Sequence, residues 1–328
     1  MPKLTMVEAI NLALHQEMAK DDRLIVLGED VGIDGGVFRV TDNLLAKFGA
    51  DRVVDTPLAE AGIIGMAVGM ALVGLRPIAE MQFCGFSYYI IPQLEEHASR
   101  FRSRTHGQRT CPLVIRIPYG GGVRALEHHS ESREAMFALI PGVKVAIPSG
   151  PRTARALLLG AIRDPDPVIF MEPKVSYRAF REEVPENEEL IELGTAQLVS
   201  EGSDLTIISW GSMLPRSRKA VEAVQKRRGC SVDLIDLLSI KPMDTEMITR
   251  SIKKTGRCLI VQESQLSFSV GSELIARIHD HAFYFLEAPI RRISGYDVVT
   301  PYFGREQLYI PSQSRIERGL EELLDQPL

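Results

Sequence analysis

Short apolar runs alternate with stretches of helical periodicity over most of the chain. The runs lie at residues 24–27, 113–117, 143–147 and 168–171, and then at 204–210, 232–238, 258–261 and 289–293. Continuous apolar runs of this length, bounded by glycine or proline, are typical of strands buried on both faces of a mostly parallel sheet. The stretches between them have the length of crossover helices. The pattern therefore predicts an α/β protein with two series of strands and helices.

An acidic stretch separates the two series. Residues 181–190 read REEVPENEEL, which contains a proline and few apolar side chains. Such a composition is typical of a linker between domains. We therefore predict one domain over residues 1–180, a linker over 181–192 and a second domain over 193–328.

Composition and charge exclude several function classes. The chain has 38 basic and 43 acidic residues and a net charge of −5, without a block of like charge. A nucleic-acid groove or a basic membrane-binding face is therefore not expected. The longest uncharged run, residues 61–75, is shorter than the ~20 residues that span a bilayer. Four dispersed cysteines without a CxxC pair indicate reduced thiols in a cytoplasmic protein.

The usual phosphate-binding motifs are missing. No GxGxxG follows the first apolar run, and no GxxxxGK[ST] occurs, which argues against a Rossmann dinucleotide site and a P-loop. A GDG motif with a distant asparagine, which would hold magnesium and a diphosphate, is absent as well. Two α/β domains that lack a phosphate-binding motif of their own suggest a partial active site.

The first candidate segment is residues 55–74, DTPLAEAGIIGMAVGMALVG. From Ala61 onward this helix is apolar on all sides, so we expect it to be buried completely. Gly65 and Gly69 would let another helix approach closely, as at a subunit contact. Glu60 lies in the first turn, where an acid complements the helix dipole. Alternatively, its apolar neighbours desolvate it and raise its pKa, which suits a carboxyl group that shares or donates a proton.

Two further segments carry candidate chemistry. In EMQFCGF (80–86), Gln82 and Phe86 either belong to an aromatic core or line a pocket for a flat heterocycle. In YGGGVRALEHHSE (119–131), a glycine loop follows a strand, which is where ligands bind in parallel sheets. His128 and His129 come before a helix that we expect to begin near Ser130, a suitable place for proton transfer. These arguments do not choose between the two histidines.

A proline-rich turn, GAIRDPDP (160–167), carries two more acidic residues. Asp164 and Asp166 are common turn residues, and their oxygens are also ligands for a hard cation. The spacing alone is weak evidence for either interpretation.

Several of these segments occur together in one known family. The matching segments are LGEDVG (27–32), residues 55–83, HHSESREA (128–135), PGVKV (141–145), IRDPDPVIFMEPK (162–174) and ISGYD (293–297). With these motifs the chain resembles the beta subunit of the decarboxylating component of 2-oxo acid dehydrogenase complexes, of the pyruvate or the branched-chain type. The resemblance runs from about Leu4 to the C-terminus.

This resemblance implies a fold, a reaction and partners. The fold is a thiamine-diphosphate pyrimidine-binding domain followed by a transketolase-type C-terminal domain. Two alpha and two beta chains form a heterotetramer in which the alpha chain holds magnesium and the diphosphate. The heterotetramer decarboxylates a 2-oxo acid and transfers the acyl group to lipoyl groups of an acyltransferase component.

The resemblance also assigns roles to residues. It implies that Glu60 hydrogen-bonds a pyrimidine ring nitrogen, that Leu58, Gln82 and Phe86 contact the pyrimidine, and that His129 is the active-site histidine. It further implies a potassium site, whose residues are Leu113, Ala161, Ile162, Asp164 and Asp166.

The chain departs from the family pattern in two places, and alternatives stay open. Residues 97–105 read HASRFRSRT instead of an AKxRYRS stretch, and a DLR motif reads Asp236-Leu237-Leu238. ISGYD and LYIP (308–311) favour a branched-chain substrate, whereas QFCGF resembles bacterial pyruvate enzymes. The rivals are an acetoin dehydrogenase beta subunit, a non-catalytic assembly subunit and, less well supported, a transketolase-like sugar transferase.

Overall fold

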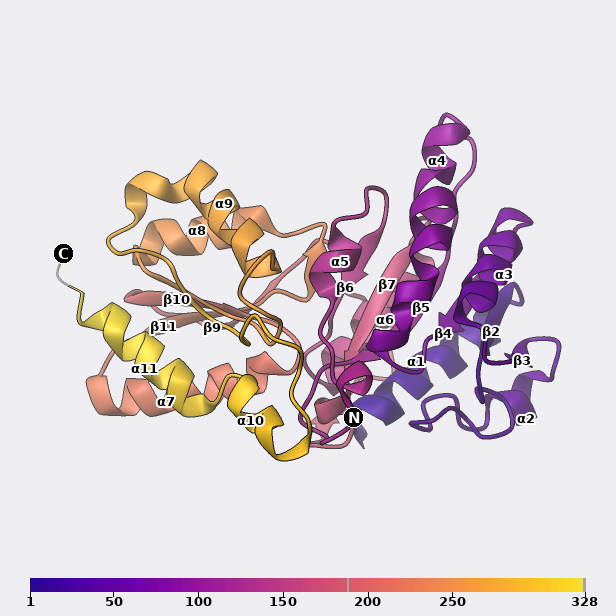
Figure 1. The fold of residues 1–328 in the computed structure, drawn as a ribbon, viewed down its shortest axis with the longest axis horizontal. Coiled ribbons are helices and arrows are strands. Elements are labelled where there is room, and N and C mark those ends of the chain that lie inside the picture. The colour runs from indigo at the N-terminus through magenta and orange to yellow at the C-terminus, as the bar shows by residue number, and fades with distance from the viewer. Residues whose placement is uncertain (188, 327–328) are drawn as a thin grey trace.

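The computed structural model describes residues 1–187 and 189–326. Glu188, in the predicted linker, and Pro327 and Leu328, at the end of the predicted second domain, lie outside the described residues. Within the described residues the strands form sheets of seven, five and two strands. Figure 1 shows the two larger sheets side by side, each covered by helices. The α/β fold with mostly parallel sheets, predicted from the apolar runs, is confirmed.

The seven-stranded sheet has the order β12-β6-β7-β5-β4-β2-β3. Its strands are β2 (Leu24–Gly28), β3 (Val53–Asp55), β4 (Arg76–Glu80), β5 (Val114–Tyr119), β6 (Lys144–Ala146), β7 (Val168–Pro173) and β12 (Ser239–Lys241). All neighbours are parallel except β12, which pairs antiparallel with β6. Because the strands are parallel, their carboxyl ends meet at one edge.

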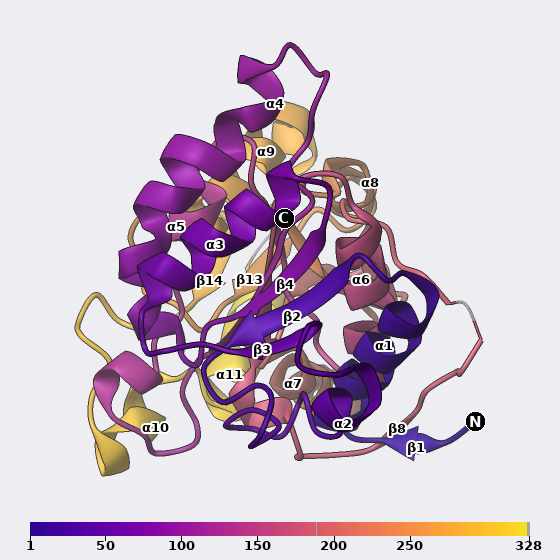
Figure 2. The same cartoon turned by 90° about the vertical axis from the view of Figure 1, so that its right-hand side faces the viewer.

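Helices cover both faces of this sheet. In chain order they are α1 (Met6–Lys20), α2 (Leu44–Phe48), α3 (Glu60–Leu72), η1 (Cys84–Ile90), η2 (Gln93–His97), η3 (Ala98–Arg100), α4 (Phe101–Arg104), η4 (Glu127–His129), α5 (Glu134–Ala138), α6 (Pro151–Arg163) and η5 (Lys174–Ser176). A capping box of Thr5 and Glu8 begins α1, which packs against α6. On the opposite face α3 packs against β4 and η1, and Figure 2 shows α3 and α5 on that side.

The five-stranded sheet has the order β14-β13-β10-β11-β9. Its strands are β9 (Gln197–Ser200), β10 (Leu205–Ser209), β11 (Val232–Asp236), β13 (Cys258–Val261) and β14 (Arg291–Ile293). Only β9 runs antiparallel to its neighbour among these described strands. The helices of this half are α7 (Met213–Arg228), α8 (Thr245–Thr255), α9 (Val270–Ala282), η6 (Phe283–Phe285), η7 (Phe303–Arg305), α10 (Glu306–Tyr309) and α11 (Gln313–Leu324). In Figure 1, α8 and α9 lie on one side of this sheet, and α7 and α11 on the other.

Two strands pair across the boundaries that were predicted between the first domain, the linker and the second domain. Strand β8 (Glu182–Glu183), inside the predicted linker, pairs with β1 (Lys3–Leu4). Strand β12 comes from the second half of the chain but joins the sheet of the first half. Just before it, Leu238 is fully buried in the core of the first half, and its carbonyl oxygen accepts a hydrogen bond from the Ile147 N–H at 2.7 Å. The departure from the DLR motif thus places an apolar side chain in an apolar core.

The expectation that helix α3 is buried completely is wrong for the single chain. Ile63, Ile64, Ala67, Val68 and Ala71 are buried, because this side packs on the sheet and on η1. The other side is exposed: it carries Gly62, Gly65 and Gly69, together with Met66, which is 42% exposed. An apolar helix face open to water is typical of a surface that another protein covers.

No helix within the described ranges has the length and the apolar character that crossing a membrane requires.

Candidate functional site

The candidate residues gather at the carboxyl edge of the seven-stranded sheet. Each lies shortly after a strand that ends there: Leu58 and Glu60 after β3, Gln82 and Phe86 after β4, and His128 and His129 after β5. Strand β2 adds Glu29 and Asp30 at the same edge. The sheet thus brings together segments that are far apart in the sequence.

An aromatic cluster surrounds His129. The centre of its ring lies 4.2 Å from that of Phe83 and 5.3 Å from that of Phe86, both in edge-to-face arrangement. His128 is exposed, whereas the Nδ1 atom of His129 is buried and has no hydrogen-bond partner among the described residues. Burial, followed by the positive charges of Lys174 and His128, lowers the pKa of His129. Of the two histidines, His129 therefore faces the site, and it is neutral at pH 7.

The helix expected near Ser130 begins later. Glu127–His129 form the short 3-10 turn η4, and α5 begins at Glu134.

Acidic and amide groups also follow the strands that end at this edge. The Nε2 of Gln82 donates to the Oδ2 of Asp30 at 3.0 Å. Burial and the nearby carboxylates of Glu60 and Asp30 raise the pKa of Glu29. Glu60 itself is only half-buried, and Leu58 is 78% exposed. Complete desolvation of Glu60, one of the two expectations for this residue, is not reached within this chain.

Two glycines allow the loops of the site to meet. A Cβ atom at Gly85 would overlap the carbonyl group of His128, so the backbone of η1 approaches the histidine loop closely at this glycine. Gly120 has φ +84°, and a Cβ atom there would lie 2.7 Å from a carboxylate oxygen of Glu263. The glycine loop predicted from the sequence thus packs directly against the second half of the chain.

Buried polar groups behind this loop were missed by the sequence reasoning. Glu263 accepts hydrogen bonds from the Gly121 N–H at 2.6 Å and from the Ser132 hydroxyl at 3.1 Å. The Nζ of Lys174 donates to the carbonyl oxygen of Gly120 at 2.6 Å. Lys174 stands in the MEPK segment directly after β7, and its position at the end of a strand was the available signal. Glu263 had no comparable signal, because it depends on how the two halves pack.

The residues of the predicted potassium site lie together at the opposite, amino edge of the sheet. Leu113 precedes β5, Ala161 and Ile162 end α6, and Asp164 and Asp166 precede β7. These residues are therefore separate from the cluster around His129.

Cationic side chains already contact this segment. The guanidinium of Arg76 donates to the carbonyl oxygens of Ile162 at 2.5 Å and Asp164 at 3.0 Å. The Nζ of Lys144 lies 2.7 Å from the Asp164 carboxylate. A potassium ion would have to share these oxygens with the chain's own cations, so the residues do not form a free cage.

The described residues contain no group of three or more His, Cys, Asp or Glu side chains arranged to hold a metal ion.

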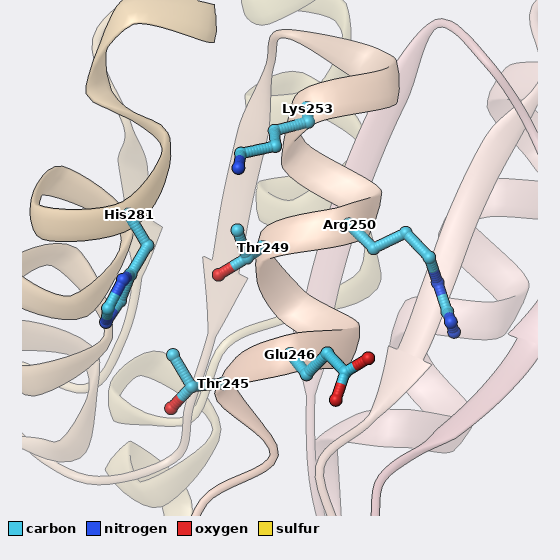
Figure 3. Close-up of a pocket in the computed structure, with 6 residues that line it drawn as sticks. All are labelled: Thr245, Glu246, Thr249, Arg250, Lys253 and His281. Atoms are coloured by element: carbon cyan, nitrogen blue, oxygen red, sulfur yellow. The ribbon is translucent and has the colours of Figure 1, made fainter.

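The chain also has an open hollow of about 570 Å³ on the second half, shown in Figure 3. Thr245, Thr249 and Lys253 on α8 point from one side and His281 on α9 from the other, while Arg250 and Glu246 point away. This hollow is far along the chain from the residues at the sheet edge and contains none of the candidate residues.

Comparisons with known proteins identify the fold and the family of the chain. A family model described as "Transketolase, pyrimidine binding domain" matches residues 2–179, and one described as "Transketolase, C-terminal domain" matches residues 194–316. A solved structure titled "Split gene transketolase, inactive beta4 tetramer" superposes with a TM-score of 0.81 at 20% identity, covering 98% of this chain and 99% of that chain. The chain thus has the two-domain fold of the transketolase type.

Similarity in sequence narrows the class. The chain is 48% identical over 320 residues to the "Pyruvate dehydrogenase E1 component subunit beta" of Acholeplasma laidlawii, covering 98% of both chains. It is 44% identical over 325 residues to the protein of the same name from Staphylococcus aureus strain N315, covering 99% of this chain and 100% of the relative. The chain belongs to the family of pyruvate dehydrogenase E1 component beta subunits.

Proposed function

We propose that this chain is the beta subunit of a thiamine-diphosphate-dependent pyruvate dehydrogenase component. The observation that carries the proposal is the carboxyl edge of the seven-stranded sheet, along which Glu60, Gln82, Phe86 and His129 each follow the end of a strand. Family membership and the names of the relatives favour pyruvate over a branched-chain substrate.

The residues at the sheet edge suit an aminopyrimidine ring. Such a ring needs an aromatic or apolar surface and a few groups that hydrogen-bond its nitrogens. Phe86 and Leu58 offer the first, and Glu60 and Gln82 the second, as the resemblance assigns them. Thiamine diphosphate supplies the electron sink for the loss of carbon dioxide from a 2-oxo acid. In the proposal Glu60 holds and shares the proton at a pyrimidine ring nitrogen.

His129 serves the second half of the reaction. A neutral imidazole near the aromatic pocket can hold or hand over a proton as the acyl group passes to a lipoyl group. Phe83 and Phe86 fix the imidazole ring in place. We therefore assign His129 to reductive acylation of the lipoyl-bearing acyltransferase component.

An alpha subunit completes the site in this proposal, within a heterotetramer of two alpha and two beta chains. It holds magnesium and the diphosphate, for which this sequence carries no GDG motif. The exposed Leu58 and the exposed glycine face of α3 are surfaces that a second subunit would cover. Potassium at residues 161–166 and a cytoplasmic location stay predictions from the sequence.

Substrate choice is the test of this function. The chain, reconstituted with its alpha subunit and thiamine diphosphate, is given pyruvate, 3-methyl-2-oxobutanoate or acetoin, and kcat/KM is measured for each. We expect pyruvate to be preferred at least ~10-fold, since a pocket that fits a methyl group strains against the larger branched side chain. A higher kcat/KM for the branched substrate, or turnover of acetoin alone, would assign the chain to one of the rival functions.

A further inference from the structure

Lys174 is a buried cation next to the candidate site. It begins η5 directly after β7 and is only 4% exposed. Its Nζ donates to the Gly120 carbonyl oxygen at 2.6 Å and lies 5.9 Å from the centre of the Phe83 ring. Moving an ammonium group out of water costs free energy, so a buried lysine indicates a role in the fold or in the reaction.

Both groups that Lys174 contacts, the Gly120 carbonyl and the Phe83 ring, belong to the surroundings of His129. Gly120 begins the loop that ends at His129, and Phe83 is the ring packed closest against the imidazole among the described aromatic neighbours, at 4.2 Å. Lys174 therefore fixes the start of the histidine loop and one wall of the histidine pocket.

The charge of Lys174 persists at neutral pH. Burial lowers the pKa of Lys174 to about 8, while Glu263 and Glu306 oppose this shift. Its hydrogen bond goes to a neutral carbonyl group, so no directly bonded carboxylate cancels the charge. The charged and titratable groups that act on His129 are Lys174 and His128, which disfavour a protonated imidazole, and Glu127, which favours it.

We propose that Lys174 is a positioning residue for His129: its hydrogen bond to the Gly120 carbonyl and its contact with the Phe83 ring place the imidazole. Its positive charge adds to the effect of burial, which disfavours a protonated imidazole. This inference rests on the proposed role of His129 in acyl transfer. It adds a residue from η5, directly after β7, that acts on the reaction without touching the substrate.

Three substitutions separate the two effects. Lys174→Gln keeps a hydrogen-bond donor but removes the charge, Lys174→Met removes both, and Lys174→Arg keeps both. Lys253→Gln, on α8 and away from the site (Figure 3), is the matched control for loss of a lysine charge.

Each variant is reconstituted as a heterotetramer and measured in two ways. Carbethoxylation of His129 by diethyl pyrocarbonate, followed by mass spectrometry of the cofactor-free protein, gives the pH midpoint of the neutral imidazole. The exposed His106, just after α4 and away from both substituted lysines, is the reference within the same sample. The pH profile of acyl transfer to a free lipoyl domain is then recorded with the cofactor bound.

The expected results differ among the variants. In Lys174→Gln the midpoint of His129 rises by about 0.5 to 1 pH unit, because a nearby positive charge is gone. The acid limb of the acyl-transfer profile moves up with it. Lys174→Met shows the same shift and a rate at the optimum that is lower by about 10-fold, because the loop is no longer held. Lys174→Arg and Lys253→Gln keep the wild-type midpoint.

Two outcomes overturn the inference. The first is an unchanged pH midpoint of His129 in Lys174→Gln. The second is a rate of acyl transfer in Lys174→Gln that is lowered by the same factor at every pH, which is the result expected if Lys174 has a purely structural role. If Lys174→Met does not fold, Lys174→Gln and Lys174→Arg still show whether the charge of Lys174 affects the pH midpoint of His129. In His129→Ala, an acid limb that persists would contradict the proposed role of His129, whereas the carbethoxylation midpoints would still test Lys174.

Discussion

Replacing Glu60 by glutamine should lower the rate of pyruvate decarboxylation by about 100-fold or more in the reconstituted heterotetramer. Proton transfer by a positioned side chain contributes about 100-fold to 10,000-fold to an enzymatic rate. Glutamine has almost the same size as glutamate but cannot share a proton with a ring nitrogen. Glu60 is half-buried at the start of α3, so the substitution leaves the core unchanged.

Release of carbon dioxide from labelled pyruvate measures this effect under saturating thiamine diphosphate. Glu95→Gln in the π-helix segment η2 is the matched control, since it changes the same chemical group on the same half of the chain. Assembly with the alpha subunit, followed by size-exclusion chromatography, should be the same in both variants. A Glu60→Gln rate within a few-fold of wild type would show that Glu60 does not have this role.

Replacing Arg116 by methionine should lower the free energy of unfolding by about 3 to 5 kcal/mol, the usual cost of breaking a buried ion pair. Arg116 is fully buried in β5, where it donates to Glu80 at 2.5 Å and to both oxygens of Glu172 at 2.7 and 2.9 Å. Tyr177 donates to Glu172 as well, at 2.5 Å. Without Arg116, two buried carboxylates lose their cation while methionine fills most of the volume.

Urea unfolding of the full-length chain tests this expectation. Burial raises the pKa of Glu80 even with Arg116 present. A carboxyl group whose pKa is raised by folding destabilises the folded state above its unfolded pKa. The deficit of Arg116→Met should therefore be largest near pH 7 and shrink as the pH is lowered toward 5. The control Arg23→Met removes an exposed ion pair with Asp21 and should change stability by less than ~1 kcal/mol. Equal stabilities of the two variants at pH 7 would refute the structural role of Arg116.

The elements of the fold were predictable from local patterns, whereas their partners were not. Continuous apolar runs predicted strands such as β2, β5 and β13, because burial on both faces leaves no polar positions. Arg116 interrupts the run at 113–117, and nothing nearby explains it: its two partners are 36 and 56 residues away. Strand β12 likewise joins the first sheet through a long-range pairing that a local pattern does not contain.

In the candidate site, too, local patterns indicated some residues, while others depend on long-range contacts. Glu60 was singled out as an acid in the first turn of an apolar helix, Gln82 at the end of an alternating stretch, and the two histidines after a glycine loop. The choice of His129 and the roles of these residues come from the resemblance and stay predictions. The pocket walls depend on tertiary contacts, which explains why Phe83, Lys174 and Glu263 were missed. Helix α3 was expected to be buried because its sequence is apolar all round, yet one face is open in the single chain. An apolar pattern alone does not tell a core from a subunit contact.

We propose that this chain holds half of an active site and works only with an alpha subunit. Decarboxylation of pyruvate with thiamine diphosphate and magnesium should therefore be measured for the chain alone, for the alpha subunit alone and for their mixture. We expect turnover in the mixture and none above background for either chain alone. Turnover by this chain alone, or an assembled mixture without turnover, would contradict it.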